Sequence, residues 1–236
     1  MAKRILIAGD SFGCEWPKGD GIGWPLILAE NHAVNNLAQA GVGEYKILKQ
    51  LHNLSAHDPY WVNNYDCVIV CHTSPSRIHT TEHPVHKEGL HKDCDLIYTD
   101  IMDKFDWFNP RLRTAKNWFH HHYDDEYAID IYNMIRAEIK KFINIPYLAV
   151  DHFEISNFYA KEDNVLNLST TWPKYKGKVN HYSDEGNQIV YNQIIDKLDK
   201  IPKDKKVVVH CRSGARSVNI ILILEANYGY NNLYNL

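Results

Sequence analysis

A serine flanked by glycines stands in the first turn that the sequence predicts. The segment reads Gly9-Asp10-Ser11-Phe12-Gly13 and follows a short apolar run. At the carboxyl end of a parallel strand, such a turn presents the serine hydroxyl at the mouth of the sheet, with backbone amides beside it. The hydroxyl becomes nucleophilic only with a base, and His181 stands in a loop just before a long helical pattern. The pair indicates acyl transfer, although a Gly-Asp-Ser segment alone is more often only a turn.

Cys211 is the second side chain of a reactive type. It follows the apolar run Val207-Val208-Val209-His210 and precedes Arg212-Ser213-Gly214-Ala215-Arg216 and an apolar helical pattern. A cysteine that leads from a strand into a helix lies among backbone amides at the helix N-terminus, which lower its pKa and favour the thiolate. Arg212 and Arg216 add positive charge that suits an anionic sulfur donor or a persulfide. The alternative is an inert cysteine buried at the end of a strand.

Alternating strands and helices must position these residues. Near-continuous apolar runs predict strands at 4–10, 33–38, 67–72, 147–152 and 206–211, and such runs are typical of a parallel sheet covered on both faces. Apolar residues spaced by three and four predict helices at 128–143 and 183–198, the second with Ser183 as its cap. The polar, histidine-rich segment 73–116 is predicted to run over the carboxyl ends of the strands. The sequence therefore predicts an α/β fold.

The Gly-Asp-Ser turn and the histidine before the last long helix together resemble the SGNH or GDSL hydrolase family, over about residues 4–200. The resemblance implies a three-layer, flavodoxin-like α/β domain, taken as residues 1–200. It also implies hydrolysis of a small acyl or O-acetyl ester without a cofactor. In this family pattern Ser11 attacks the ester and His181 accepts its proton. The segment 34–41 is similar to the family's second block, so that the amides of Ser11 and Gly41 hold the oxyanion.

The third block departs from the family's pattern. Its Gly-x-Asn-Asp is replaced by His72-Thr73-Ser74-Pro75, which puts Ser74 where the oxyanion asparagine of the family stands. A hydroxyl of Ser74 or Thr73 is the candidate replacement donor. Thr73 and Asp10 are also predicted to contact the substrate.

The fourth block lacks the expected acid. The residue three positions before His181 is Lys178, and an imidazole without an orienting carboxylate is a poorer base. Three alternatives follow. Asp151 or Asp184 supplies the orientation, or the site works as a Ser–His pair, or the chain is a non-catalytic binding module of this shape.

The C-terminal segment, residues 203–236, resembles the second half of a rhodanese domain. The resemblance implies a βαβ segment in which Cys211 carries a persulfide, with Arg212 and Arg216 binding the sulfur donor. Tyrosine phosphatases place an arginine six residues after the cysteine, where this chain has Ser217, so the shorter loop favours sulfur over phosphate. Thiosulfate sulfurtransfer is the alternative function, although no first rhodanese half is recognised upstream.

Composition narrows the expected partners. Lysine and arginine number 26 against 29 aspartates and glutamates in 236 residues, which gives no reason to expect nucleic acid or an anionic membrane. The apolar run after Met-Ala-Lys-Arg is too short for a signal peptide, and no run reaches the length of a membrane span. Five cysteines without framework spacing indicate free thiols in a cytoplasmic compartment. The expected partner is a small-molecule ester, and the oligomeric state is left open.

Two further groups of side chains lie in the segment 73–123. Possible zinc ligands are His79, His83, His86, His91 and Cys94. Their spacing matches no familiar closed site, so no metal is predicted. Six aromatic residues are predicted to pack in a core or lid rather than to line a carbohydrate pocket: Tyr98, Trp107, Phe108, Trp118, Phe119 and Tyr123.

Overall fold

The computed structural model describes residues 2–15, 22–153, 164–177 and 181–200, and the backbone of 207–209 and 233–235. The chain divides into two compact units, Met1–Asp199 and Lys200–Leu236, and each is described by itself. The first unit contains the predicted serine and histidine. The second contains the predicted cysteine loop, but Cys211, Arg212 and Arg216 lie outside the described residues.

A parallel five-stranded sheet forms the centre of the first unit, in the order β2-β1-β3-β4-β5. Its strands are β1 Arg4–Gly9, β2 Ala33–Asn36, β3 Cys67–His72, β4 Tyr147–Asp151 and β5 Val165–Asn167. All six residues of β3 are buried, as expected for a strand with helices on both faces. The predicted α/β fold class with a parallel sheet is confirmed.

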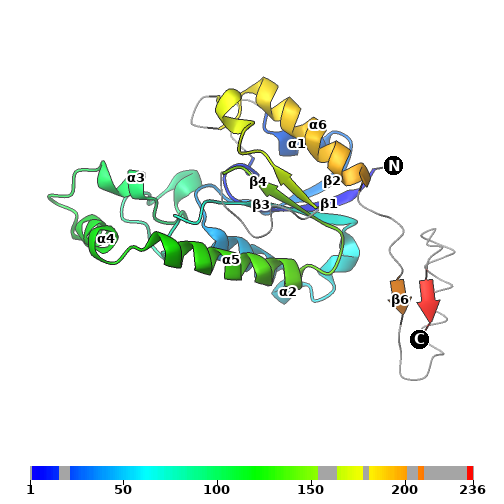
Figure 1. Ribbon diagram of the computed structural model, residues 1–236, viewed down its shortest axis with the longest axis horizontal. Helices are drawn as coiled ribbons and strands as arrows, with labels where there is room; N and C mark the ends of the chain where they lie inside the picture. Colours follow the sequence, from blue (N-terminus) through cyan, green and yellow to red (C-terminus); the bar gives the residue numbers. More distant parts are fainter. Residues whose placement is uncertain are drawn as a thin grey trace. The chain divides into compact units, whose positions relative to one another are not determined.

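Helices cover both faces of this sheet (Figure 1). Helices α1 Trp24–Ala29 and α6 Asp184–Lys200 lie on one face, and α2 Glu44–His57 and α5 Asp125–Phe142 on the other. Side chains alternate along a strand, so the even-numbered positions of β1 and β3 pack against α2 and α5. That core contains Leu6, Ala8, Val68, Val70, Ile47, Leu51 and Ile139.

Polar side chains cap the two long helices that the sequence predicted. Asp124 accepts a hydrogen bond from the amide of Tyr127 at 2.8 Å at the start of α5. The hydroxyl of Ser183 accepts one from the amide of Gly186 at 3.2 Å, which confirms Ser183 as the cap of α6. Such caps satisfy amides that have no partner within the helix. The Ser183 cap therefore sets the start of α6 at Asp184, three residues after His181.

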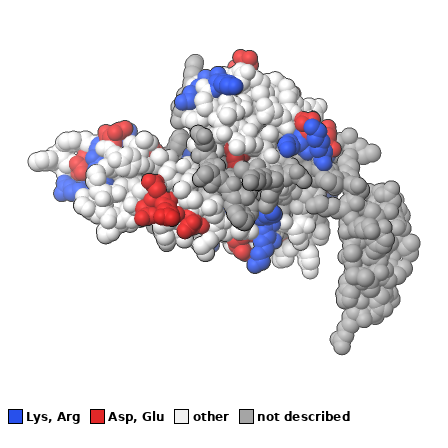
Figure 2. All heavy atoms as spheres, viewed as in Figure 1, with Lys and Arg blue, Asp and Glu red and all other residues white. Residues whose placement is uncertain are grey.

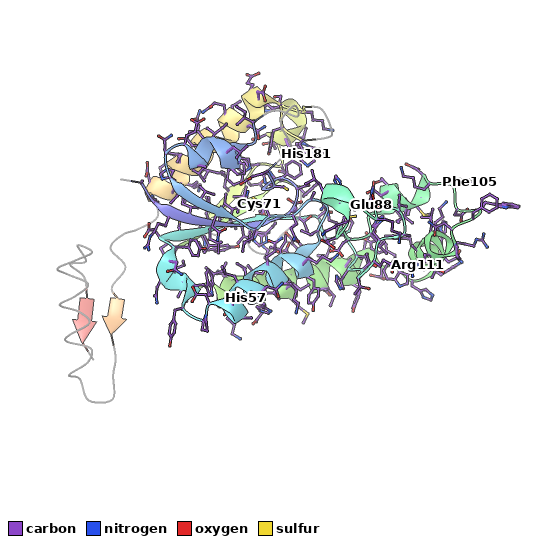
Figure 3. The ribbon with its side chains drawn as sticks, turned by 180° about the vertical axis from the view of Figure 1, so that it is seen from behind. His57, Cys71, Glu88, Phe105, Arg111 and His181 are labelled. Atoms are coloured by element: carbon purple, nitrogen blue, oxygen red, sulfur yellow. The ribbon has the colours of Figure 1, made fainter. Side chains whose placement is uncertain are left out.

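The segment between β3 and α5 extends away from the sheet and has a small core of its own. It contains the 3-10 turn η2 Gly89–His91 and the helices α3 Tyr98–Met102 and α4 Pro110–His121. Two more 3-10 turns lie outside this segment, η1 Trp61–Asn64 before β3 and η3 Trp172–Lys174 after β5. Phe119, Trp118 and Tyr123 pack with Ile101 and Leu112, as predicted for three of the six aromatic residues. Trp107 and Phe108 are instead 68% and 88% exposed. Phe105 points into solvent near them, at the outer end of the segment (Figure 3).

The second unit has a separate two-stranded sheet. Strand β6 Val207–Val209 pairs in parallel with β7 Leu233–Asn235. Of the predicted strand 206–211, the structure describes Val207–Val209, which pair within the second unit.

The described surface carries both signs of charge. On the face shown in Figure 2, acidic and basic side chains form small separate groups. Within the described ranges, no helix combines the length and the apolar character that a bilayer crossing requires. The four cysteines of these ranges, Cys14, Cys67, Cys71 and Cys94, are buried and free of disulfides.

Candidate functional site

Ser11 lies in a tight turn at the carboxyl end of β1. The amide of Gly13 donates to the carbonyl of Asp10 at 3.1 Å, and the amide of Phe12 donates to the Asp10 carboxylate at 3.0 Å. Gly9 has a φ of 154°, and a Cβ there would lie 2.6 Å from the Cβ of Cys71, so only glycine allows β1 to turn this close to β3. Ser11 itself is 6% exposed.

His181 lies near the carboxyl end of β1, although it is far from Ser11 in the sequence. Its carbonyl accepts a 2.6 Å hydrogen bond from the amide of Gly177, and its ring centroid lies 5.1 Å from that of Phe12. Phe12 follows Ser11 in the chain, so the His181 ring lies at the same strand end as the predicted nucleophile. A direct hydrogen bond between the Ser11 hydroxyl and the His181 imidazole stays a prediction.

Aromatic rings around Phe12 join the strand ends. His152 stacks on Phe12 with centroids 4.4 Å apart and an interplanar angle of 11°, and Trp172 and Tyr182 meet the ring at its edge. The Nδ1 atom of His152 lies 3.0 Å from the hydroxyl of Tyr182. Burial lowers the pKa of His152 to about 3, so this imidazole is neutral at pH 7. His152 was not predicted as a site residue, because it is the last residue of an apolar run predicted as the strand 147–152.

The Gly41 loop is held by the segment that follows β3. Gly41 has a φ of 76°, and a Cβ there would lie 2.5 Å from the Cβ of Cys94. The carbonyl of Gly41 accepts from the amide of Asp95 at 2.9 Å, and the fully buried Asp95 carboxylate accepts from the amide of Gly43 at 2.7 Å. The conformation that a Gly41 oxyanion donor would need is therefore imposed from the 94–95 region.

Arg77 connects the serine turn with the Gly41 loop. Its guanidinium donates to the carbonyl of Val42 at 2.9 Å and lies 3.4 Å from the Asp10 carboxylate. Asp10 is fully buried. Burial raises its pKa, and the charge of Arg77 and the Phe12 amide oppose that rise. Asp10 thus acts as a buried anchor of the turn, a role that no spacing rule in the sequence indicates.

Thr73 and Ser74 lie where β3 ends. Thr73 is fully buried, and its amide donates to the Glu44 carboxylate at 3.3 Å. The Ser74 hydroxyl lies 2.8 Å from that of Ser76. The structure therefore places both residues at the carboxyl edge with Ser11, and their predicted contacts with the oxyanion or substrate stay predictions.

The two carboxylates considered as partners of His181 have defined contacts elsewhere. Both oxygens of the buried Asp151 accept hydrogen bonds from Arg136, at 2.7 and 3.0 Å. Asp184 accepts from the amide of Ile22 at 3.3 Å. The Asp151–Arg136 pair fastens β4 to α5, which is a structural function. Lys178 lies outside the described residues.

Helix α2 supplies two buried polar side chains to the strand ends. The amide group of Gln50 accepts from the Gly9 amide at 2.9 Å and donates to the Gly9 carbonyl at 3.0 Å. The carboxylate of Glu44 lies 2.5 Å from Nδ1 of His72. Helix α2 was not among the helices predicted from the sequence, because Glu44 and Gln50 interrupt the apolar pattern on its buried side.

One group of potential metal ligands forms within the described ranges: His83, His86 and Cys94. The Nδ1 atom of His83 accepts from the amides of Val85 and His86 at 3.1 and 3.0 Å. The proton of the neutral ring is therefore on Nε2, and a cation at Nε2 would shift it to Nδ1. Zn²⁺ at Nε2 would leave the two amides unpaired at about 1–3 kcal/mol each, a cost that the metal–ligand bonds would have to offset.

A groove of about 500 Å³ lies along α2. Gln39, Lys46, Lys49 and Asp93 are among its lining residues. None of the predicted catalytic residues lines it. The groove therefore does not identify the reaction.

Comparison with known proteins adds little to this description. No protein-family model and no curated protein matches the chain. Among solved structures, the chain is similar to the lipase Lip_vut3 from a goat rumen metagenome, with a TM-score of 0.41 and 10% sequence identity over 85% of this chain and 98% of that chain. A likeness this distant carries no argument about function. The fold defines an α/β protein, and its activity has to be argued from the strand-end residues.

Proposed function

We propose that this protein is a serine hydrolase that cleaves a small acyl ester, with Ser11 as nucleophile and His181 as general base. The observation that carries the proposal is the contact of the His181 ring with Phe12, at 5.1 Å, beside a serine in a glycine-bounded turn at the carboxyl edge. The resemblance to the SGNH family in these two segments supports it. The low exposure of Ser11, 6%, favours a small acyl group.

The reaction follows from these residues. The Ser11 oxygen attacks the ester carbonyl carbon while its proton passes to His181, and the carbonyl electron pair moves onto the oxygen. The amides of Ser11 and Gly41, with a hydroxyl of Ser74 or Thr73, stabilise that oxyanion. Collapse expels the alcohol, which takes the proton from His181, and water then releases the acid by the same steps.

The test compares Ser11→Ala with a matched variant, Ser55→Ala on α2. Purified protein is assayed with p-nitrophenyl acetate and labelled with a fluorophosphonate probe, whose site is located by mass spectrometry. We expect Ser11→Ala to lose turnover by at least about 1,000-fold and to lose labelling, at an unchanged melting temperature. His181→Gln should lose turnover similarly, and Ser55→Ala should behave like the wild type. Full turnover in Ser11→Ala would show that Ser11 is only a turn residue and refute the proposal. A wild type that the probe does not label would favour the non-catalytic binding module.

Sulfur transfer through a persulfide on Cys211 is a separate proposal, made for the second unit. The parallel pairing of β6 with β7 supports the βαβ order that a half-rhodanese segment requires. Thiosulfate:cyanide turnover that disappears in Cys211→Ser would make sulfurtransfer the main activity.

A further inference from the structure

Three potential ligands converge behind the Gly41 loop. One ligand atom from each of His83, His86 and Cys94 lies within 4.8 Å of the others. His83 and Cys94 are 1% and 2% exposed, and His86 is half-buried. A thiolate with imidazoles is a donor set that suits Zn²⁺.

A buried nitrogen in this group has no partner. The Nε2 atom of His83 is buried and accepts or donates no hydrogen bond in the described structure, whereas Nδ1 is bonded to two backbone amides. Buried polar atoms are almost always paired. Nε2 carries the ring proton while Nδ1 accepts, so Nε2 becomes a metal ligand only when that proton moves.

The surroundings supply a further ligand and a supporting carboxylate. The ring centroid of His91 lies 5.6 Å from that of His86, and the amide of Cys94 donates to the His91 carbonyl at 3.1 Å. The Asp100 carboxylate lies 3.4 Å from Nε2 of His86. A carboxylate on one ring nitrogen is the usual partner of a histidine that binds a metal through the other.

The loop that holds these residues has little regular structure. An isolated antiparallel bridge joins Ile78 to Leu96, and between them the structure describes only the short turn Gly89–His91 as helical. Ile78, Val85 and Leu96 pack against the small core of the segment between β3 and α5. A cation joining residues 83 and 94 would add a further link within this loop.

We propose that His83, His86, His91 and Cys94 bind one Zn²⁺ ion, and that this structural site holds the Gly41 loop in place. Binding moves the proton of the His83 ring from Nε2 to Nδ1 and releases the thiol proton of Cys94 to solvent. The thiolate sulfur then donates an electron pair to the ion without any change of oxidation state. Cys94 contacts Gly41 directly, and its neighbour Asp95 bonds both Gly41 and Gly43. The effect on Gly41 as an oxyanion donor rests on the proposed function, whereas zinc binding does not.

The experiment uses the full chain, freed of metal with a chelator and titrated with Zn²⁺ and then with Co²⁺. We expect one Zn²⁺ per chain, and in the Co²⁺ form a thiolate-to-cobalt charge-transfer band with the intense visible bands of tetrahedral Co²⁺. Cys94→Ser should lose the charge-transfer band. Asp100→Asn, a change on a partly exposed side chain, should weaken Zn²⁺ binding about 10- to 100-fold even if Cys94→Ser fails to fold.

Two controls separate this site from other donors in the chain. Cys211→Ser and His121→Gln should keep the band and the affinity. The proposal would be overturned by zinc binding below one equivalent, by a band that survives in Cys94→Ser, or by wild-type affinity in Asp100→Asn.

Removing zinc should lower kcat for p-nitrophenyl acetate at least about 10-fold at nearly constant KM. If zinc binds but no ester is cleaved, the proposed function fails and the metal site stands; if ester cleavage is unaffected by zinc removal, the link to Gly41 fails.

Discussion

His152 should make the stability of the protein fall steeply in mild acid. Its side chain is fully buried, stacked on Phe12 at 4.4 Å and bonded through Nδ1 to Tyr182 at 3.0 Å. Burial lowers its pKa from 6.5 to about 3. The folded protein therefore keeps this ring neutral at pH values where the unfolded chain protonates it.

The sign and size of the effect follow from proton linkage. Between pH 6.5 and about 3 the unfolded state binds more protons at His152, so the free energy of unfolding falls as the pH falls. The slope for one group is about 1.4 kcal/mol per pH unit. Lowering the pH from 7 to 4.5 should therefore remove about 2–3 kcal/mol of stability through this residue alone. Above pH 6.5 the contribution is complete.

Urea unfolding at pH 7, 6, 5 and 4.5 tests this prediction with His152→Gln and the exposed control His57→Gln. We expect the stability advantage of the wild type over His152→Gln to shrink by about 2–3 kcal/mol across this range, while His57→Gln stays parallel to the wild type. Parallel curves for the wild type and His152→Gln would refute the reasoning, because they would mean that His152 titrates alike in both states.

Three further changes test the strand-end contacts. Arg77→Met should lower ester turnover about 10- to 100-fold through the oxyanion loop, more than Arg77→Lys does, whereas the exposed Arg113→Met should have no effect; equal turnover in all three would remove Arg77 from the site. Asp151→Asn removes the negative charge that faces the buried Arg136 and should cost about 3–5 kcal/mol of unfolding free energy in urea, against less than about 1 kcal/mol for the half-exposed Asp66→Asn; similar losses would contradict the buried pair. Cys211 should react with iodoacetamide at pH 7 before Cys67, whose pKa is raised to about 12 by burial; mass spectrometry of the labelled peptides decides the order.

The sheet could be predicted wherever a strand is long and buried on both faces. β1, β3 and β4 appear in the sequence as apolar runs because both faces meet helices. β5, Val165–Asn167, has only three residues, too few to show a period. Helix α2 was missed because its buried side includes Glu44 and Gln50, and polar residues at core positions disrupt an apolar pattern.

The candidate site could be predicted only where its residues belong to a local motif. Ser11 and His181 each stand in a recognisable segment, so a family resemblance found both. Arg77, Asp95 and His152 act through contacts between loops that are distant in the sequence. No spacing rule connects an arginine after β3 with an aspartate after β1, because that contact exists only once the parallel strands are aligned.

The first turns of α2 contact three segments: the Gly41–Gly43 loop, the end of β3 and the end of β1. The helix begins directly after Gly43, Glu44 binds the end of β3, and Gln50 binds the end of β1 as a neighbouring strand would. Each residue of a helix adds a rotation of about 100° and a rise of about 1.5 Å. One residue inserted between Glu44 and Gln50 would therefore turn one of them away from its strand. In evolution the length of this stretch should be constrained more tightly than the identity of its exposed residues, so that related chains would vary here by substitution and not by insertion.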